Sequence, residues 1–156
     1  MAHFSIPMDK LAEKIGLKME KVVKMTALLV FGKVVMRSPV DTGRFRANWT
    51  CTYGEPAIGY TRDSLDTGSS TLERVASQIE RFPVGGWMWL TNSLPYAGVL
   101  EYGGYPNPPK FGSWKMGEAG PAVHVTGGYS MQAPQGMVRI TAREFAADVK
   151  ERLERV

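Results

Sequence analysis

Ser38-Pro39-Val40-Asp41-Thr42-Gly43-Arg44-Phe45-Arg46-Ala47-Asn48-Trp49 is where the sequence changes from one long helical pattern to short strands and glycine-rich loops. Pro39 lacks a backbone N–H and disfavours helical geometry at Ser38, so a helix arriving from the N-terminal side is expected to end there. Asp41 can bond to the backbone about two residues on, and Gly43 can adopt a positive φ. We therefore predict a tight turn, followed by a strand over about Phe45–Tyr53.

The residues before this stretch predict one long helix, from Asp9 as a plausible N-cap to about Arg37. At 1.5 Å per residue it would be about 40 Å long, more than a domain of this size can bury. Residues Lys24 to Met36 are apolar nearly all round. Such a segment is either the central core helix or is covered by a partner chain, and both interpretations stay open.

The residues after the first strand predict a second helix and a second strand. Ser70 and Glu73 have the spacing of a capping box at the start of a helix over Thr71–Phe82. Trp87–Thr91 is short, aromatic and apolar, so it predicts a strand that pairs with the first one. Core packing in this sheet is expected for three tryptophans, with a base-stacking platform as the alternative: Trp49, Trp87 and Trp89.

The last third of the chain predicts a glycine- and proline-rich loop and a final helix. A short helix is expected to end at Gly103. Residues 103–136 then hold eight glycines and five prolines, so they cannot form one regular element. The final helix, about Met137–Arg155, is expected to pack on the sheet. We expect one α+β domain over residues 1–156: a long N-terminal helix, a small mostly antiparallel sheet, a middle helix and a C-terminal helix on the sheet, with an extended loop at 103–136.

The composition argues against several function classes. The 19 Lys and Arg against 15 Asp and Glu give a net charge of +4, too small an excess for a dedicated nucleic-acid binder. Cys51 is the only cysteine and there are two histidines, so a disulfide framework or a multi-cysteine zinc site is not expected. Neither a nucleotide-binding motif nor a catalytic set is present. We expect no enzyme, no cofactor and no metal.

The sequence also lacks the signals of a membrane or secreted protein. No apolar run approaches the ~18 residues that a membrane span needs. The N-terminal residues have neither the basic region nor the long apolar run of a signal peptide. We therefore expect a soluble, non-secreted protein with no membrane partner.

Three stretches together resemble a known family. Ser38–Trp49 resembles the signature P-V-D-T-G-x-L-R-x-S/N of the neck and tail-completion proteins of long-tailed bacteriophages. Pro95-Tyr-Ala-Gly-Val-Leu-Glu-Tyr-Gly103 resembles that family's second signature, Y-A-x-x-x-E-x-G. Ala133-Pro-Gln-Gly-Met-Val-Arg139 is similar to the P-x-G-(F/M)-(L/V)-R segment that opens its final helix. The three occur in the family's order and spacing.

The resemblance implies a virion structural protein without catalysis. Such a protein forms a ring with copies of itself at the head–tail junction, is assembled in the host cytoplasm, and contacts connector or head-closure and tail proteins. DNA passing through the lumen would be contacted at most non-specifically. A tail terminator ring that caps the tail tube is the alternative within this class. A nucleic-acid-binding module is the alternative from another class.

The resemblance also suggests which residues carry the contacts. Asp41, Thr42 and Gly43 would shape the turn, and Arg44 and Arg46 would be available to acids on a neighbouring copy. Glu101 is the candidate partner for such an arginine, within the stretch that also contributes Tyr96, Tyr102 and Gly103. The alternative is an internal tie between this turn and Glu101. In the loop, the residues expected to order against a partner are Tyr105, Phe111, Trp114 and Tyr129.

Overall fold

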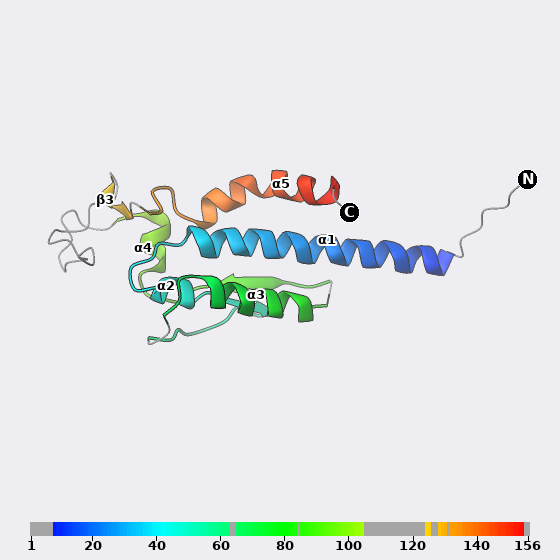
Figure 1. Cartoon of the computed structure of the whole chain (residues 1–156), viewed down its shortest axis with the longest axis horizontal. Helices are drawn as coiled ribbons and strands as arrows, with labels where there is room; N and C mark the ends of the chain where they lie inside the picture. The colour runs from blue at the N-terminus through cyan, green and yellow to red at the C-terminus, as the bar shows by residue number, and fades with distance from the viewer. Residues whose placement is uncertain are drawn as a thin grey trace, which may run out of the picture.

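The computed structural model describes residues 8–62, 65–83, 85–104, 124–125, 128–130 and 132–154. Its elements are α1 (Met8–Arg37), α2 (Arg44–Ala47), β1 (Thr50–Tyr53), α3 (Ser69–Arg81), β2 (Met88–Thr91), α4 (Ala97–Tyr102), β3 (His124–Val125), β4 (Tyr129–Ser130) and α5 (Val138–Glu154). The α+β class is confirmed. Helix α1 lies between α5 on one side and α3 with the β1–β2 sheet on the other (Figure 1).

In the described part of the chain, the sheet beside α1 has two antiparallel strands, β1 and β2. β1 pairs with β2 in the register Thr50↔Thr91 to Tyr53↔Met88. A second, smaller pair joins His124 of β3 to Ser130 of β4. The long loop predicted at 103–136 is thus interrupted by two short strands. Three of its candidate partner residues, Tyr105, Phe111 and Trp114, lie outside the described residues.

Two buried clusters fill the space between α1 and the elements that cover it. The first surrounds the second half of α1 and contains Val34, Val35, Phe45, Trp49, Leu94, Leu100 and Met137. The second lies between α1, α3 and the sheet and contains Cys51, Val75 and Ile79. Burial raises the pKa of the Cys51 thiol to about 11. This thiol therefore stays protonated near neutral pH and is a poor nucleophile.

The predicted strand over Phe45–Tyr53 is wrong in its first half. Residues Arg44–Ala47 form the helical turn α2, and the strand begins only at Thr50. Phe45 and Trp49 are four residues apart, one helical turn, and both are buried in the same cluster with an edge-on ring contact at 5.8 Å. The loose alternation of apolar residues fitted a strand. Four residues of strand would separate the two Cα atoms by about 13 Å, so the 5.8 Å ring contact fits a turn of helix better than a strand.

The capping box predicted from Ser70 and Glu73 is also wrong. Helix α3 begins at Ser69 after Gly68, and the side chain of Asp66 accepts a hydrogen bond from the Thr71 backbone N–H at 2.7 Å. Burial opposes the charged form of Asp66. Hydrogen bonds from Thr71, Gly68 and Ser70 outweigh that effect and hold its pKa well below the ordinary value. A carboxylate outside the predicted motif caps this helix.

The tryptophans separate into a buried and an exposed set, against the prediction that all three are packed in the sheet core. Trp49 is buried, whereas Trp87 is 75% exposed and precedes β2. Within the sheet, Cys51 pairs with Leu90 and both contribute to the core. Trp89 comes directly before Leu90 in β2, and because successive side chains of a strand alternate, it points to the opposite, outer face.

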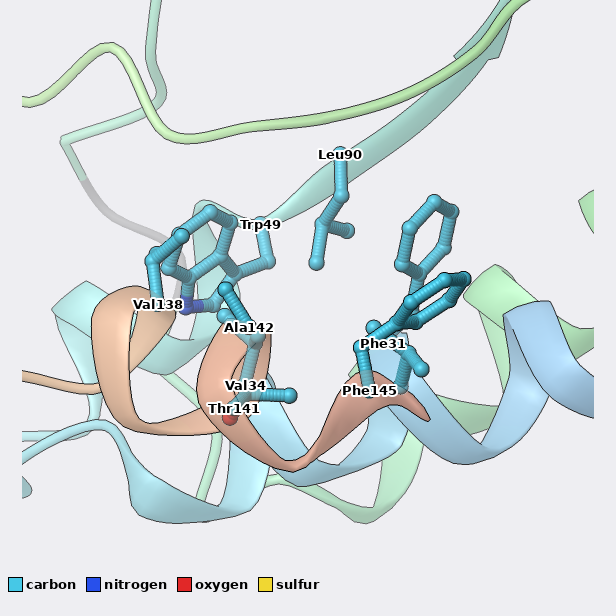
Figure 2. Close-up of a pocket in the computed structure, with 9 residues that line it drawn as sticks. Phe31, Val34, Trp49, Leu90, Val138, Thr141, Ala142 and Phe145 are labelled. Carbon is cyan, nitrogen blue, oxygen red and sulfur yellow. The ribbon is translucent and has the colours of Figure 1, made fainter. Parts of the chain in front are cut away.

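Helix α5 runs along the second half of α1. The Glu144 carboxylate lies 2.9 Å from both Lys33 Nζ and Arg37 Nη2, and Arg37 Nη1 donates to Thr141 Oγ1 at 3.0 Å. The predicted packing of this helix on the sheet is not observed, because α5 packs on α1. It faces the sheet across an apolar cavity of about 310 Å³, bordered by Leu90 of β2 and by Val138 and Phe145 of α5. Figure 2 shows these side chains on opposite sides of that cavity.

Candidate functional site

The three stretches that carry the family resemblance meet at one end of the molecule, where α1 ends, α4 passes and α5 begins (Figure 1). We call the residues that join them the hub: Ser38, Trp49, Glu101, Met137 and Arg139. Four of the five are buried. Stretches up to about 100 residues apart in sequence therefore form one packed unit.

Ser38 joins the first stretch to the third. Its hydroxyl oxygen accepts a hydrogen bond from the Trp49 indole N–H at 2.8 Å. The hydroxyl proton can go to the Val34 carbonyl oxygen at 2.8 Å or to the Met137 sulfur at 3.3 Å. Ser38 is the first residue after α1, so this contact holds the helix end against Trp49 and against the start of α5.

Glu101 joins the second stretch to the third, because its carboxylate caps the N-terminus of α5. It is 7% exposed and accepts hydrogen bonds from the backbone N–H groups of Met137 at 2.8 Å, Val138 at 2.9 Å and Arg139 at 2.8 Å. Burial alone would raise the pKa of Glu101. The three N–H donors and the Arg139 side chain outweigh burial, so the pKa lies below its ordinary value.

Arg139 completes the tie between α4 and α5. Its Nε donates to the Glu101 carboxylate at 3.2 Å, and its Nη2 donates to the Glu101 carbonyl oxygen at 2.6 Å and to the Tyr129 hydroxyl at 2.9 Å. The guanidinium carbon lies 5.1 Å from the centre of the Tyr102 ring and 5.7 Å from that of Tyr129. This is a cation–π contact on two rings. Of the predicted loop residues, Tyr129 is thus placed at the hub.

Gly136 allows Glu101 to come this close. It has φ 77°, and an added Cβ atom would lie 2.6 Å from the Glu101 carbonyl oxygen. A side chain there would therefore push α4 away from α5. Gly103, at the end of α4, also has a positive φ, of 80°, as the end of a short helix often requires.

Arg46 and Gly43 hold the turn after α1. Arg46 Nε donates to the Ser38 carbonyl oxygen at 2.9 Å and Nη2 to that of Met36 at 2.7 Å, so the guanidinium caps the last carbonyls of α1. Burial lowers the pKa of Arg46, and the charge of Asp66 opposes this shift. Gly43 has φ 85°, and its carbonyl oxygen accepts from the Asp66 N–H at 3.4 Å. The Arg46 guanidinium therefore makes its hydrogen bonds within its own chain.

The predicted pairing of this turn with Glu101 is not observed. Glu101 is bound by the start of α5 and by Arg139. The turn is held instead by Gln132, the residue just before the third stretch, whose side-chain amide makes two hydrogen bonds to the Val40 backbone. In the described part of the chain, Asp41 and Arg44 are exposed and make no ion pair. Thr42 accepts a bond from the Arg44 N–H at 3.4 Å, and Tyr96 packs against the core beside Phe45.

Sequence reasoning missed three residues of this region. Arg139 belongs to the third stretch, but it was given no role from the sequence. The signal that could have found it is that Glu101, if buried, needs a partner, and an arginine in another of the three stretches was a candidate. Asn48 spans the turn: its amide donates to the Arg44 and Thr61 carbonyl oxygens and accepts from the Thr61 N–H. Arg74 of α3 donates to the carbonyl oxygens of Ala47 and Trp49. No local pattern marks these two.

The chemistry of the hub is that of a clasp between elements. Its charged groups are bound to backbone and to each other. Among the residues that the structure describes, no group of three or more His, Cys, Asp or Glu side chains could hold a metal ion. In that same part of the chain, no helix is long and apolar enough to cross a membrane. Comparisons with protein-family models, curated proteins and solved structures found no match.

Proposed function

We propose that this chain is a virion structural protein that assembles into a homo-oligomeric ring at the head–tail junction of a long-tailed bacteriophage. The observation that carries the proposal is the hub. The three stretches that resemble the neck and tail-completion signatures pack against one another through Ser38, Glu101 and Arg139. Coincidental matches at three places would have no reason to meet in space. The role needs no catalysis, cofactor or metal. A tail terminator ring remains the alternative position in the particle.

An exposed apolar surface on α1 supports self-association. Helix α1 extends past the ends of α3 and α5 (Figure 1). Its first half exposes large apolar residues, among them Ile15 at 50% and Met19 at 60%. A helix gains most of its stability from packing an apolar face, so an uncovered face of this kind indicates a partner. For the segment 24–36, a core helix and coverage by a partner chain were both open, and it is largely covered within its own chain.

The first prediction is the mass of the purified chain. We expect a closed multimer by light scattering coupled to size-exclusion chromatography, and annular particles with a central opening in negative-stain images. The mass should stay constant over a wide range of protein concentration, because a ring has no free ends. A chain that is monomeric at every concentration tested would contradict the proposal.

A second candidate function is favoured by the exposed tryptophans. The rings of Trp87 and Trp89 lie 6.4 Å apart with an interplanar angle of 30°, and exposed aromatic rings can stack on nucleic-acid bases. This candidate predicts binding of single-stranded DNA that weakens steeply with salt and falls at least tenfold on Trp87→Ala. The ring proposal predicts that Trp87→Ala leaves any weak DNA contact unchanged, so fluorescence anisotropy separates the two.

A further inference from the structure

Strand β2 has an open edge. Its partner β1 lies on one side only, and the Gly54 N–H donates to the Trp87 carbonyl oxygen at 2.8 Å, one step beyond the paired residues Tyr53 and Met88. Backbone groups alternate between the two sides of an antiparallel strand, so Met88 and Leu90 direct their N–H and C=O groups away from β1. In the described part of the chain, no hydrogen bond reaches these groups. Such an edge is a template for a further strand.

An apolar groove lies next to this edge, between β2 and α5. This groove is the cavity of about 310 Å³ that is bordered by Leu90 of β2, by Phe31 of α1, and by Val138 and Phe145 of α5. Figure 2 shows Leu90 pointing into the space between the strand and the two helices. Helix α3 contacts β1, whereas the cavity separates β2 from α5, so the open edge of β2 faces the groove. Val138 and Phe145 are 43% and 48% exposed, so the groove is open to solvent.

The open edge and the groove together fit one kind of ligand, an extended peptide segment. A strand added beside β2 would bond to Met88 and Leu90 through its backbone, and its side chains would alternate between the two faces of the sheet. Those on the same face as Leu90 would enter the groove. Thr141 is the only polar residue that lines the groove in the described part of the chain. The segment therefore needs apolar residues at two positions that are two apart, with a polar residue between them.

The N-terminal segment of this chain has that pattern. In His3-Phe4-Ser5-Ile6 polar and apolar residues alternate over four residues, which is the length of β2. Pro7 follows, and because proline has no backbone N–H it ends a strand just before α1 begins at Met8. Residues 3–7 lie outside the described part of the chain, so the match is in sequence pattern and in length.

This segment cannot reach the groove of its own chain. Val30, the first residue of α1 at the cavity, lies about 33 Å from Met8 at the helical rise of about 1.5 Å per residue. An extended chain covers about 3.5 Å per residue, so Phe4 stays within about 14 Å of Met8, roughly 20 Å short of the cavity. The first half of α1 instead extends past the ends of α3 and α5 (Figure 1) and carries the segment away from its own groove. Only the groove of another copy is within its reach.

We infer that residues 3–6 of one copy add as a strand to the open edge of β2 of a second copy, with Phe4 and Ile6 in the groove. The inference rests on the proposed self-association and names the contact that carries it. Each copy then donates one segment and accepts one, through two different surfaces. Such a head-to-tail contact passes from copy to copy and closes into a ring when the rotation between copies allows it.

Substitution of the two apolar side chains tests the donated segment. We expect Phe4→Ser with Ile6→Ser to weaken self-association at least tenfold in light scattering, because two apolar side chains are lost from the groove, while the helical circular dichroism stays unchanged. His3→Ser with Ser5→Ala is the matched control. These side chains lie in the same segment but on the opposite face of the added strand, so this variant should assemble like the wild type.

A charge placed in the groove tests the accepting surface. Ala142 is exposed and borders the cavity, so Ala142→Arg should also weaken self-association at least tenfold. Ala147→Arg is its control, because Ala147 is exposed as well but lies about 140° further round α5. A mixture of the Ala142 variant with the Phe4 and Ile6 variant should give heterodimers and no larger species, since the mixed pair keeps one working segment and one working groove.

Amide hydrogen exchange, resolved to single residues, tests the added strand itself. The Met88 and Leu90 N–H groups should exchange at least tenfold more slowly in the wild-type multimer than in the Phe4 and Ile6 variant, because the added strand supplies their acceptors. The Trp89 N–H, which is on the β1 side of the strand, should exchange alike in both.

The outcomes separate this inference from the ring proposal. A multimeric wild type whose assembly survives the Phe4 and Ile6 substitutions, or is lost equally in the His3 and Ser5 control, would overturn the inference and leave the ring proposal standing. The same holds if the mixed variants give no heterodimer. A wild-type dimer with mutually exchanged segments would uphold the inference and contradict the ring. A wild type that never self-associates would overturn both.

Discussion

Glu101→Ala should lower the free energy of unfolding by roughly 3–4 kcal/mol, the range expected when one partner of a buried, hydrogen-bonded ion pair is removed. The variant leaves three backbone N–H groups at the start of α5 without their acceptor and leaves Arg139 without its carboxylate. The measurement is urea unfolding followed by circular dichroism, with the midpoint and slope compared between variant and wild type.

Glu73→Ala is the control for this prediction. Glu73 is exposed on α3, so its loss should change stability by no more than about 0.5 kcal/mol. The interpretation of Glu101 as a clasp between α4 and α5 fails if the Glu101 variant is as stable as this control. Assembly gives a second measurement. Because the Glu101 carboxylate has its hydrogen-bond donors within its own chain, a folded Glu101→Gln protein should form a multimer of the wild-type mass.

The same residue predicts an acid dependence with a defined sign. The pKa of Glu101 in the folded protein lies below its ordinary value, which is about 4.3 in an unfolded chain. Its contribution is therefore fully present above the unfolded pKa and is lost as the pH falls from there toward the folded pKa. Asp66 shifts in the same direction, so Glu101→Gln should reduce, and not abolish, the loss of stability between about pH 6 and about pH 3.

Gly43→Val is the second large effect, with an expected loss of roughly 3–5 kcal/mol. Gly43 has φ 85°, where a β-branched side chain is strained. An added Cβ would also lie 2.6 Å from the Asp66 carbonyl oxygen and 2.8 Å from its nitrogen. These are backbone atoms, so the loop that caps α3 would have to move. Thermal and urea unfolding measure the loss.

Gly54→Val is the matched control, since Gly54 has nearly the same φ, 81°, and no atom within 4 Å of an added Cβ. It should cost only the backbone strain, about 1–3 kcal/mol. The difference between the two variants measures the close approach of Gly43 to Asp66. Equal losses from both would show that this contact does not matter.

The long helices were predictable because their signals are local. Pro39 ends α1 at Arg37, close to where the sequence placed the end, and the apolar spacing before it predicted a helix of the observed length. The expected α+β class followed from two helical patterns on either side of short apolar segments. In each case the deciding interaction lies within a few residues of the element that it controls.

The short segments were less predictable because several structures fit the same few residues. Phe45 and Trp49 were compatible with a strand, and only the folded chain shows their rings in contact across the helical turn of α2. Trp87 and Trp89 had the composition of a core strand, but only the pairing register shows which face of β2 is buried. Asp66 was not expected to cap α3 because it lies outside the local capping motif.

The sequence alone determined where α1 ends, that residues 103–136 could not be one regular element, and which three stretches to compare with a family. Only the tertiary structure decided what those stretches do. Glu101 and Arg139 are 38 positions apart and Ser38 and Met137 are 99 apart, so no local pattern encodes their contact. A buried charge must find a partner, but a linear sequence does not say which one. The folded chain brings Arg139 to Glu101, because α4 and α5 pack together at the end of α1.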